Sequence, residues 1–189
     1  AKQFSERFPK VNLRTDLMVT DEGRVFCGGG MTADLNLAVY LIDKFCGREV
    51  ALQSSRCSLV DMSRVSQQPF SVFSPEKRHH DKEVLSLQNW IDENYALNLS
   101  IEEMASNINM SSRHLNRRFK KATGETVVKY TQLIRVEIAK RDIESKRISF
   151  EEVSRSVGYE NISFFRKVFK SVTGLSPTEY RKKFGFGLT

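Results

Sequence analysis

The stretch Ser100-IEEMASNINMSSRHLNRRFKKATGETVVK-Tyr130 returns about 50 residues later as Ser149-FEEVSRSVGYENISFFRKVFKSVTGLSPTE-Tyr180. Matching residues lie 49 positions apart in the first part of the repeat and 50 apart in the second part. This change in spacing means that the second copy contains one additional residue just before its second helix. A match of this length is difficult to obtain by chance, so it predicts two copies of one structural unit.

Both copies carry the same signals for two helices. Ser100 and Ser149 are N-cap residues, and a glutamate three residues later completes a capping box. A tight turn follows, and a second helix ends at a glycine, Gly124 or Gly174. The first helices are expected to turn inward their apolar residues, which are Ile101, Met104 and Ala105 in one copy and Phe150, Val153 and Val157 in the other. Helix, short turn and helix form the helix-turn-helix plan.

The second helix of each copy is cationic, since neither 112–122 nor 161–173 contains Asp or Glu. At 100° per residue the apolar residues share one face, namely Leu115, Phe119 and Ala122, then Phe165, Phe169 and Val172. The opposite face carries Arg113, Asn116, Arg117 and Lys120 in the first copy, and Ser163, Arg166, Lys167 and Lys170 in the second. An α-helix fits the major groove of DNA, where such side chains bond base edges or phosphates. The pattern favours groove binding over two solvated helix faces.

One helix of about residues 126–145 joins the copies, with an expected apolar face of Val127, Tyr130, Leu133, Ile134 and Ile138. Nineteen or so residues span about 28 Å, and successive major grooves on one side of DNA lie about 34 Å apart. The helix can therefore hold two reading helices in adjacent grooves of somewhat bent DNA. Arg135, Lys140 and Arg141 fit phosphate contacts and solvated charges equally well. An opening helix of about 82–95 presents Val84, Leu87, Trp90, Ile91 and Tyr95, with Trp90 assigned to the core.

Charge is unevenly distributed along the 189 residues, whose net charge is +7. Residues 1–75 carry 9 basic and 8 acidic side chains, whereas residues 76–189 carry 21 and 15. A basic second half indicates an anionic partner, most often nucleic acid. There is no apolar run of the roughly 20 residues that span a bilayer and no signal-peptide core, so a cytoplasmic location is expected. The three cysteines form neither a disulfide framework nor a zinc site.

Two further segments precede the repeat. Residues 66–80 break helical and strand periodicity and contain Pro69 and Pro75, which predicts a linker. Its adjacent His79 and His80 point about 100° apart on a helix, which favours solvated side chains over a metal site.

Residues 1–65 read as a turn at 21–23, a short strand, a run of glycines at 28–30 and a helix that ends at Gly47. The expected apolar face of this helix is Leu35, Ala38, Leu41, Ile42 and Phe45. A further short element begins at 49–51. The glycine run lacks the lysine of a phosphate-binding loop. Cys27 has no histidine before His79 to serve as its base, so a structural turn is favoured over a nucleophile.

Residues 82–184 resemble the DNA-binding domain of the AraC/XylS family of bacterial transcription regulators. The resemblance is carried by Met110-SSRHLNRRFKKAT-Gly124, Arg135, Val157-Gly-Tyr159, Phe165-RKVF-Lys170 and Gly174-LSPTEY-Arg181. It implies base-reading or groove roles for Arg113, Asn116, Arg117, Asn161, Ser163, Arg166 and Lys167. Phosphate contacts are expected from Ser112, Lys120, Lys121 and Lys170. Ile162 and Phe164 are more apolar than is usual for the family, which shifts the second helix toward thymine methyls or DNA shape.

A weaker resemblance concerns Asp21-EGRVFCGGGMT-Ala33 and the helix that follows. This stretch is similar to the final third of the PfpI-like, class I glutamine amidotransferase-like domain that precedes this DNA-binding domain in one subgroup. The nucleophilic cysteine of that domain would lie upstream. Residues 1–65 are therefore expected to be the C-terminal remnant of an α/β domain.

The sequence thus predicts a mainly α protein, with a seven-helix double helix-turn-helix domain over 81–189 after a partial α/β segment. Its helix-turn-helix units are expected at about 100–124 and 149–174. The expected function is sequence-specific binding of double-stranded DNA by a transcription regulator, either an activator or a repressor, without catalytic residues, metal or cofactor. RNA polymerase, a homodimer formed through the upstream domain and an effector of unknown chemistry are expected partners. The alternatives are a PfpI-like hydrolase or amidase fragment that uses Cys27, and a module that binds an acidic protein without DNA sequence preference.

Overall fold

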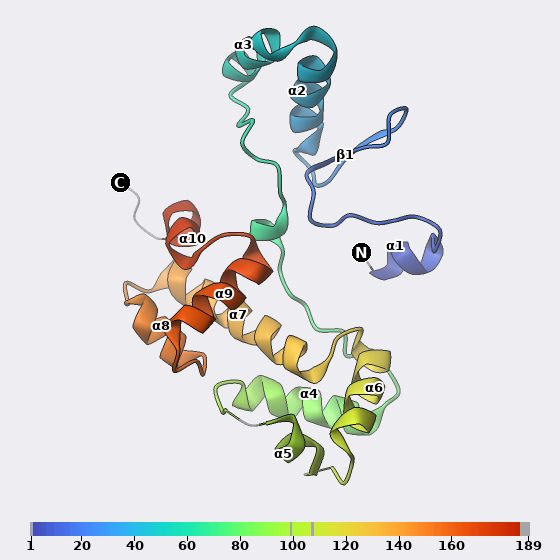
Figure 1. Ribbon diagram of the computed structural model, residues 1–189, viewed down its shortest axis with the longest axis vertical. Coiled ribbons are helices and arrows are strands. Elements are labelled where there is room, and N and C mark those ends of the chain that lie inside the picture. Colours follow the sequence, from blue (N-terminus) through green and yellow to red (C-terminus); the bar gives the residue numbers. More distant parts are fainter. Residues whose placement is uncertain (1, 99, 107, 186–189) are drawn as a thin grey trace. The chain divides into compact units, whose positions relative to one another are not determined.

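The computed structural model describes residues 2–98, 100–106 and 108–185. Within these ranges the chain is mostly helical, and it divides into two compact units, residues 1–71 and residues 72–189 (Figure 1). The boundary between the units falls inside the segment 66–80 that the sequence predicts as a linker. The mainly α fold predicted from the sequence is confirmed.

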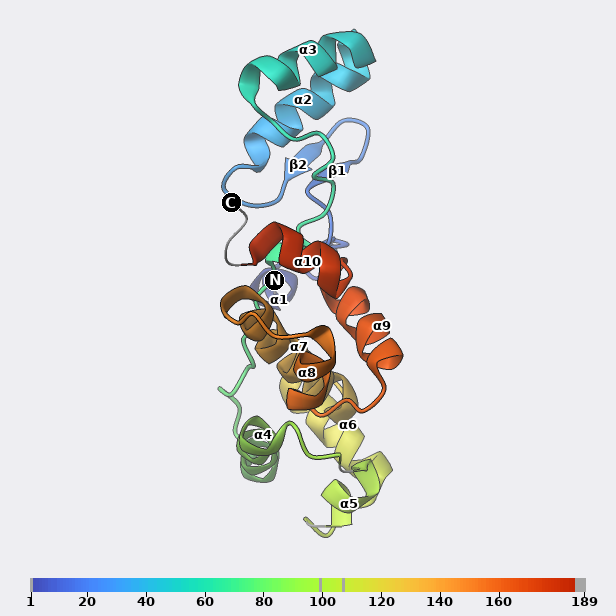
Figure 2. The same ribbon diagram turned by 90° about the vertical axis from the view of Figure 1, so that its left-hand side faces the viewer.

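The second unit contains seven helices in its described part, as the repeat predicts. They are α4 (Lys82–Asn94), α5 (Ile101–Ser106), α6 (Ser112–Thr123), α7 (Val127–Ser145), α8 (Phe150–Ser156), α9 (Ile162–Thr173) and α10 (Pro177–Phe184). Helices α5 and α6 form the first helix-turn-helix, and α8 and α9 form the second. Figure 2 shows the long helix α7 running between the two copies, and it packs against helices of both.

Local capping explains where the helices of the repeat begin and end. The side chain of Glu103 accepts the N–H of Ser100 at 2.6 Å, and that of Glu152 accepts the N–H of Ser149 at 2.7 Å. The backbone bond and a second bond from the Ser100 hydroxyl hold the pKa of Glu103 below its ordinary value, and Ser149 lowers the pKa of Glu152 in the same way. Gly124 and Gly174 end α6 and α9 with φ of 88° and 75°, in the left-handed region that glycine adopts without strain.

Two hydrophobic cores lie at opposite ends of α7. The first contains Val84, Leu87, Ile91, Met104, Ala105, Leu115, Phe119, Val127 and Tyr130, and Trp90 packs against it as expected. The second contains Val136, Ala139, Ile143, Val153, Val157, Tyr159, Phe165, Val168, Phe169 and Tyr180. The single apolar face expected for α7 is therefore wrong in part. Because the helix serves one core with its first turns and the other with its later turns, Val136 and Ala139 are buried while Leu133 is only half-buried.

The first unit is small. It contains α1 (Lys2–Arg7), an antiparallel pair of β1 (Val19–Asp21) and β2 (Phe26–Gly28), α2 (Ala33–Cys46), α3 (Arg48–Ser58) and a short 3-10 helix, η1 (Gln68–Phe70). Val19 lies opposite Gly28 in the pair. The predicted turn is present, since the carboxylate of Asp21 accepts the N–H of Gly23 at 2.7 Å. The predicted helix end at Gly47 is also present.

The apolar face predicted for α2 is wrong. Ala33 and Val39 are the buried residues of this helix, whereas Leu35 is 50% exposed and Phe45 is 68% exposed. In the described part of the unit, α3 and the strand pair pack against α2 and cover only one side of the helix. A segment of about 70 residues lacks the layers needed to bury every apolar face.

The predicted linker is tied down at both ends. In the first unit, Gln67 donates its amide to the carbonyl of Leu17 at 3.0 Å. In the second unit, the N–H of Phe73 donates to the side chain of Glu137 at 3.1 Å. His79 is half-buried, and its Nε2 lies 2.7 Å from Oε1 of the fully buried Gln88. The expectation of a solvated His79 is therefore wrong, because the segment folds back on α4.

Candidate nucleic-acid interface

Helix α6 exposes a cationic stripe because its opposite face is anchored in the first core. Ser111 caps the helix by accepting the N–H of His114 at 3.3 Å, and Leu115 and Phe119 are fully buried. The remaining surface carries Arg113, Arg117, Lys120 and Lys121, which are all exposed. Among the described residues, no carboxylate forms an ion pair with any of these four side chains.

Two other predicted residues of this helix form bonds within the chain. The Oδ1 atom of Asn116 accepts the N–H of Val127 at 3.3 Å, which ties α6 to the start of α7. The hydroxyl of Ser112 donates to Glu102 of α5 at 3.4 Å. Asn116 is half-buried, so the structure places it at the margin of the cationic stripe.

Helix α9 repeats this arrangement in the second core. Asn161 is its N-cap and accepts the N–H of Phe164 at 2.9 Å, while Phe165 and Phe169 are fully buried. The exposed side carries Ser163, Arg166, Lys167 and Lys170. Arg166 lies 4.0 Å from Glu151 in an exposed ion pair of the kind that contributes little and that a stronger anion can replace.

Phe164 distinguishes the second stripe from the first. It is 49% exposed, and its ring meets the ring of Tyr159 nearly edge-on at 5.8 Å. The equivalent position of the first copy, 50 residues earlier, is the exposed His114. The apolar character expected of the second helix is thus present on its surface at Phe164.

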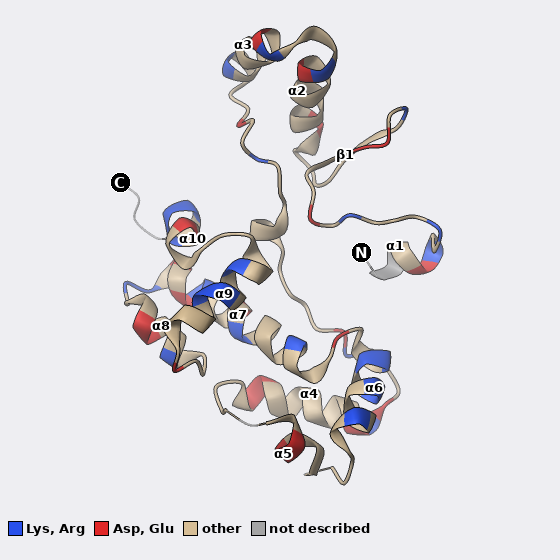
Figure 3. Ribbon diagram, in the orientation of Figure 1, with Lys and Arg blue, Asp and Glu red and all other residues tan. Residues whose placement is uncertain are grey.

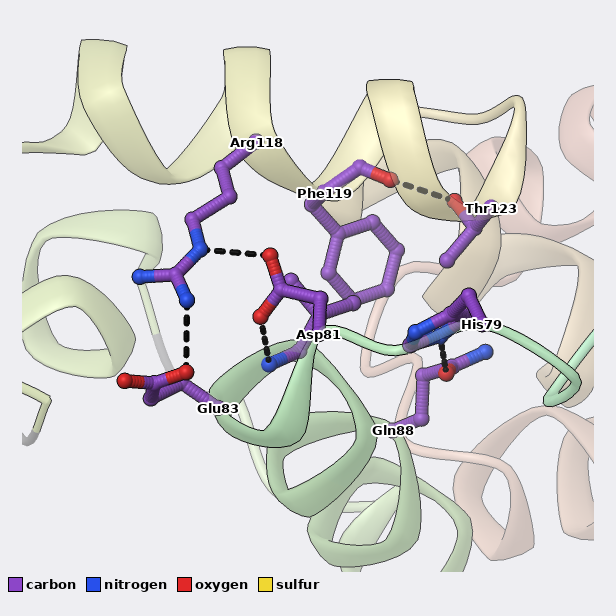
Figure 4. A network of polar contacts seen from close by, with 8 residues as sticks. His79, Asp81, Glu83, Gln88, Arg118, Phe119 and Thr123 are labelled. Atoms are coloured by element: carbon purple, nitrogen blue, oxygen red, sulfur yellow. Dashed lines mark hydrogen bonds and ion pairs between the residues drawn. The ribbon is translucent and has the colours of Figure 1, made fainter.

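Arg118 is a residue of α6 that the sequence did not single out. Its guanidinium bonds Asp81 and Glu83 at 2.5 Å each, which ties α6 to the first turn of α4 (Figure 4). Burial raises the pKa of Asp81, but the hydrogen bonds from Arg118 and from the N–H of Val84 outweigh it and keep that pKa below its ordinary value. The signal for this role was the position of Arg118 at the edge of the apolar face, about 60° from Leu115 on the helical wheel.

An open cleft of about 1040 Å³ lies beside this ion pair. Arg117 and Lys121 of α6 line it together with His80 and Lys82 near the start of α4. The cationic surface of α6 therefore continues to Lys82, next to Asp81 and Glu83, which also line the cleft and pair with Arg118.

The sequence predicted phosphate contacts or solvated charges for Arg135 and Lys140. Both predictions are wrong, because these side chains are buried. Arg135 donates to three backbone carbonyls, and Lys140 bonds both carboxylate oxygens of Glu137, at 2.9 and 3.1 Å. Neither side chain is available to a phosphate or to bulk water. Arg141 is exposed, as both a phosphate contact and a solvated charge require.

Charge is segregated among the helices of the second unit. Figure 3 shows basic residues along α6 and α9, whereas α5 carries acidic residues. In each helix-turn-helix the acidic residues therefore lie on the first helix and most of the basic residues on the second, with Arg155 of α8 as the exception. An anion that approaches α6 or α9 meets few carboxylates on the helix itself.

Comparison with known proteins identifies this part of the molecule. A family model described as a helix-turn-helix domain matches residues 104–183. The DNA-binding domain of the global transcriptional factor AdpA, solved in complex with a target DNA, shares the fold with a TM-score of 0.51 and 28% identity. That match covers 53% of this chain and 91% of the AdpA domain.

The C-terminal part of this chain has the fold of AraC-type DNA-binding domains and is called the AraC-type domain below. The bifunctional transcriptional activator/DNA repair enzyme AdaA of Bacillus subtilis is 32% identical over 107 residues, which are 57% of this chain and 51% of AdaA. The regulator GbdR of Pseudomonas aeruginosa is 25% identical over 183 residues, which are 95% of this chain and 49% of GbdR. The chain thus spans about half the length of these relatives. The GbdR match extends beyond the AraC-type domain into the first unit.

The described residues bring no metal-binding group together. No set of three His, Cys, Asp or Glu side chains is placed to hold a metal there. Cys27, Cys46 and Cys57 of the first unit are free thiols on the surface. Each of the described helices is too short or too polar to cross a bilayer.

Proposed function

We propose that this protein is a sequence-specific transcription regulator whose AraC-type domain places α6 and α9 in successive major grooves of duplex DNA. One observation carries the proposal. Two equivalent helices, joined by the 19-residue α7, each bury an apolar face and expose a basic face. The length of α7, about 28 Å, fits adjacent grooves if the DNA bends slightly.

The exposed side chains divide into two roles in this proposal. Base edges are read by Arg113 and Arg117 of α6 and by Ser163, Arg166 and Lys167 of α9, with Asn116 and Asn161 at the margins. Phosphates are held by Ser112, Lys120, Lys121 and Lys170, which fixes the register of the domain but carries no sequence information. Phe164 favours thymine, whose methyl group offers an apolar contact in the major groove.

The remaining parts of the proposal rest on the relatives and on the sequence resemblance. Residues 1–65 are the amidotransferase-like part of the chain in this proposal, which rests on the sequence resemblance of residues 21–33; the GbdR match also reaches these residues. A regulator of this kind acts in the cytoplasm on RNA polymerase, as a homodimer and in response to an effector. The exposed apolar residues of α2 are consistent with further protein packing on the first unit.

Selection of bound sequences from randomised duplex DNA tests the proposal. The expected result is a motif of two blocks whose centres lie about 10 base pairs apart, one block for each reading helix. Binding that falls with salt but enriches no sequence contradicts base reading and favours the backbone alone.

A matched pair of variants separates base reading from general charge. Lys167→Ala removes a cation from the α9 stripe, whereas Lys182→Ala removes an exposed cation from α10. Only the first variant is expected to change the selected motif. The same change from both variants contradicts the assignment of the stripe.

A further inference from the structure

The two helix-turn-helix copies meet at a joint beside the middle of α7. The joint consists of the loop after α4, residues 95–98, and the turn between α8 and α9 around Gly158 (Figure 1). Arg135 of α7 is buried at its centre, with 8% of its surface exposed.

Arg135 bonds both copies through backbone carbonyls. Its Nε donates to the carbonyl of Tyr95 at 2.7 Å, and its Nη2 donates to that of Leu97 at 2.9 Å. On the other side of the guanidinium, Nη1 donates to the carbonyl of Gly158 at 3.1 Å. One rigid, planar group thus connects the loop that follows α4 to the turn that precedes α9.

The backbones of the two copies are also in direct contact at this point. A Cβ atom built on Gly158 would lie 2.4 Å from the carbonyl oxygen of Ala96, closer than real Cβ atoms approach an oxygen. Gly158 also has a φ of +82°, which disfavours any side chain. Only glycine therefore allows the turn to press against the loop.

Aromatic side chains extend the joint to the reading helix α9. The guanidinium of Arg135 lies 4.9 Å from the ring centroid of the buried Tyr159, and Tyr159 in turn contacts Phe164 in the first turn of α9. On the other side, Tyr95 follows α4 of the first copy but packs against the core of the second. The first copy therefore packs Tyr95 against the second, and the second copy presses the backbone of Gly158 against the first.

The chemistry of Arg135 suits a positioning role rather than a charge role. A guanidinium keeps its proton at any pH in the protein, so it can remain buried only where acceptors satisfy its donors. Among the described residues its acceptors are the three carbonyls, and no carboxylate pairs with it. Lysine has a single nitrogen on a flexible stem and cannot present the same fixed fork.

We propose that Arg135 fixes the orientation of α6 relative to α9, so that the joint sets the spacing between DNA half-sites that the domain accepts. Helix α7 alone sets the distance between the copies, but bending of α7 and rotation of the two bundles about it would still move one reading helix against the other. The joint opposes these movements. This inference rests on the proposed function, since spacing matters only if both helices read DNA.

The DNA experiment measures binding to duplexes that carry both selected half-sites with the spacing between them changed by one or two base pairs in either direction. The full chain is expected to prefer one spacing by about tenfold or more. Arg135→Lys is expected to reduce this preference to about threefold, with the half-site sequences unchanged. Arg141→Lys, an equal change at an exposed site of the same helix, is the control and should keep the preference.

A uniform loss of affinity in Arg135→Lys with an unchanged spacing profile would overturn the proposal. Gly158→Ala disturbs the joint through different atoms and must show the same loosened preference. It also provides the test if Arg135→Lys does not fold.

A measurement without DNA separates this proposal from the proposed function. The exposed Cys27, Cys46 and Cys57 are replaced by Ser, and spin labels are attached at Lys82→Cys of α4 and Ser171→Cys of α9. The distance distribution between the labels is expected to be narrow in this background and distinctly broader with Arg135→Lys. Equal widths contradict the joint even if DNA selection succeeds, and a broadened distribution supports it even if DNA selection fails.

Discussion

In the first helix-turn-helix, α6 is tied to α4 by the guanidinium of Arg118 on Asp81 and Glu83. In the second, the equivalent position is Val168, which is buried in a core rich in aromatic rings. Phe165, Phe169, Tyr180 and Phe184 follow one another there with centroids 4.7 to 5.7 Å apart. The repeat therefore keeps its fold while the interactions that hold each reading helix differ, so the copies should respond differently to salt and pH.

The polar character of the first copy extends beyond Arg118. The amide of Gln88, which is fully buried, donates to the backbone carbonyl of Glu76 at 3.0 Å and lies 3.4 Å from the hydroxyl of Tyr130. That hydroxyl in turn lies 3.4 Å from Asp92, and burial together with this carboxylate raises the pKa of Tyr130. In the second copy, the hydroxyl of Tyr180 donates to Glu144 at 2.6 Å.

The largest effect on stability is expected from removing one aromatic ring from either core. Phe169→Ala should cost about 3–5 kcal/mol in the free energy of unfolding, because it leaves a cavity next to Tyr180. Phe119→Ala should cost a similar amount in the first copy, since both rings are fully buried. Urea unfolding followed by circular dichroism measures the total loss. The fluorescence of Trp90, the one tryptophan of the chain, reports the first core and should shift only with Phe119→Ala.

The next effect concerns DNA. Arg117→Ala and Lys167→Ala, at equivalent positions of the two stripes, should each cost about 1–3 kcal/mol at the selected site if they contact bases. If they contact only phosphates, affinity should fall equally on all sequences and the salt slope should flatten by about one unit. Binding assays at several salt concentrations distinguish the two results. Unchanged binding by both variants contradicts the assignment of the stripes.

The stability lost on mutation should depend on salt in the first copy and not in the second. Arg118→Ala removes two charge-assisted hydrogen bonds at a partly exposed position and should lower the free energy of unfolding at low salt. This cost should shrink in 1 M salt at a Debye length of about 3 Å. Val168→Ala, the equivalent change in the second copy, should lose stability by a salt-independent amount. Equal salt dependence in the two variants would remove the distinction drawn between the copies.

The smallest effect is expected from acid. Because the pKa of Asp81 is depressed in the folded protein, its ion pair stabilises the fold above the ordinary carboxyl pKa, and that contribution is lost as the pH falls through the folded pKa. Asp81→Asn should therefore lose less stability than the unmodified chain between about pH 5 and pH 2, by less than about 1 kcal/mol. Thermal unfolding along a pH series measures the difference. A parallel loss in both proteins indicates that Asp81 plays no part in acid sensitivity.

Local signals in the sequence were sufficient for the helices of the AraC-type domain. The capping pairs at Ser100 and Ser149 and the glycines at 124 and 174 act within one turn of chain, so they can be recognised without a structure. The repeat doubled each of these signals. The faces of α6 and α9 followed from helical periodicity, because each helix packs on a single core.

Periodicity failed where a helix has more than one neighbour or too few. Helix α7 packs on two cores along its length, so its buried residues do not form one stripe and its expected face was only partly right. Helix α2 has an apolar stripe, but the described part of its unit covers only Ala33 and Val39. In both cases the partners of the helix, rather than its own sequence, decide which residues are buried.

The sequence by itself determined the repeat, the capped ends of its helices, and the basic faces of α6 and α9. These features depend on caps, glycines and residue spacing, which are local properties of the chain. Only the tertiary structure decided that Arg118 and Arg135 hold the domain together while Arg113 and Arg117 face outward. Arginines look alike in a sequence, and the role of each depends on whether distant carboxylates or carbonyls come within reach of its guanidinium in the folded chain.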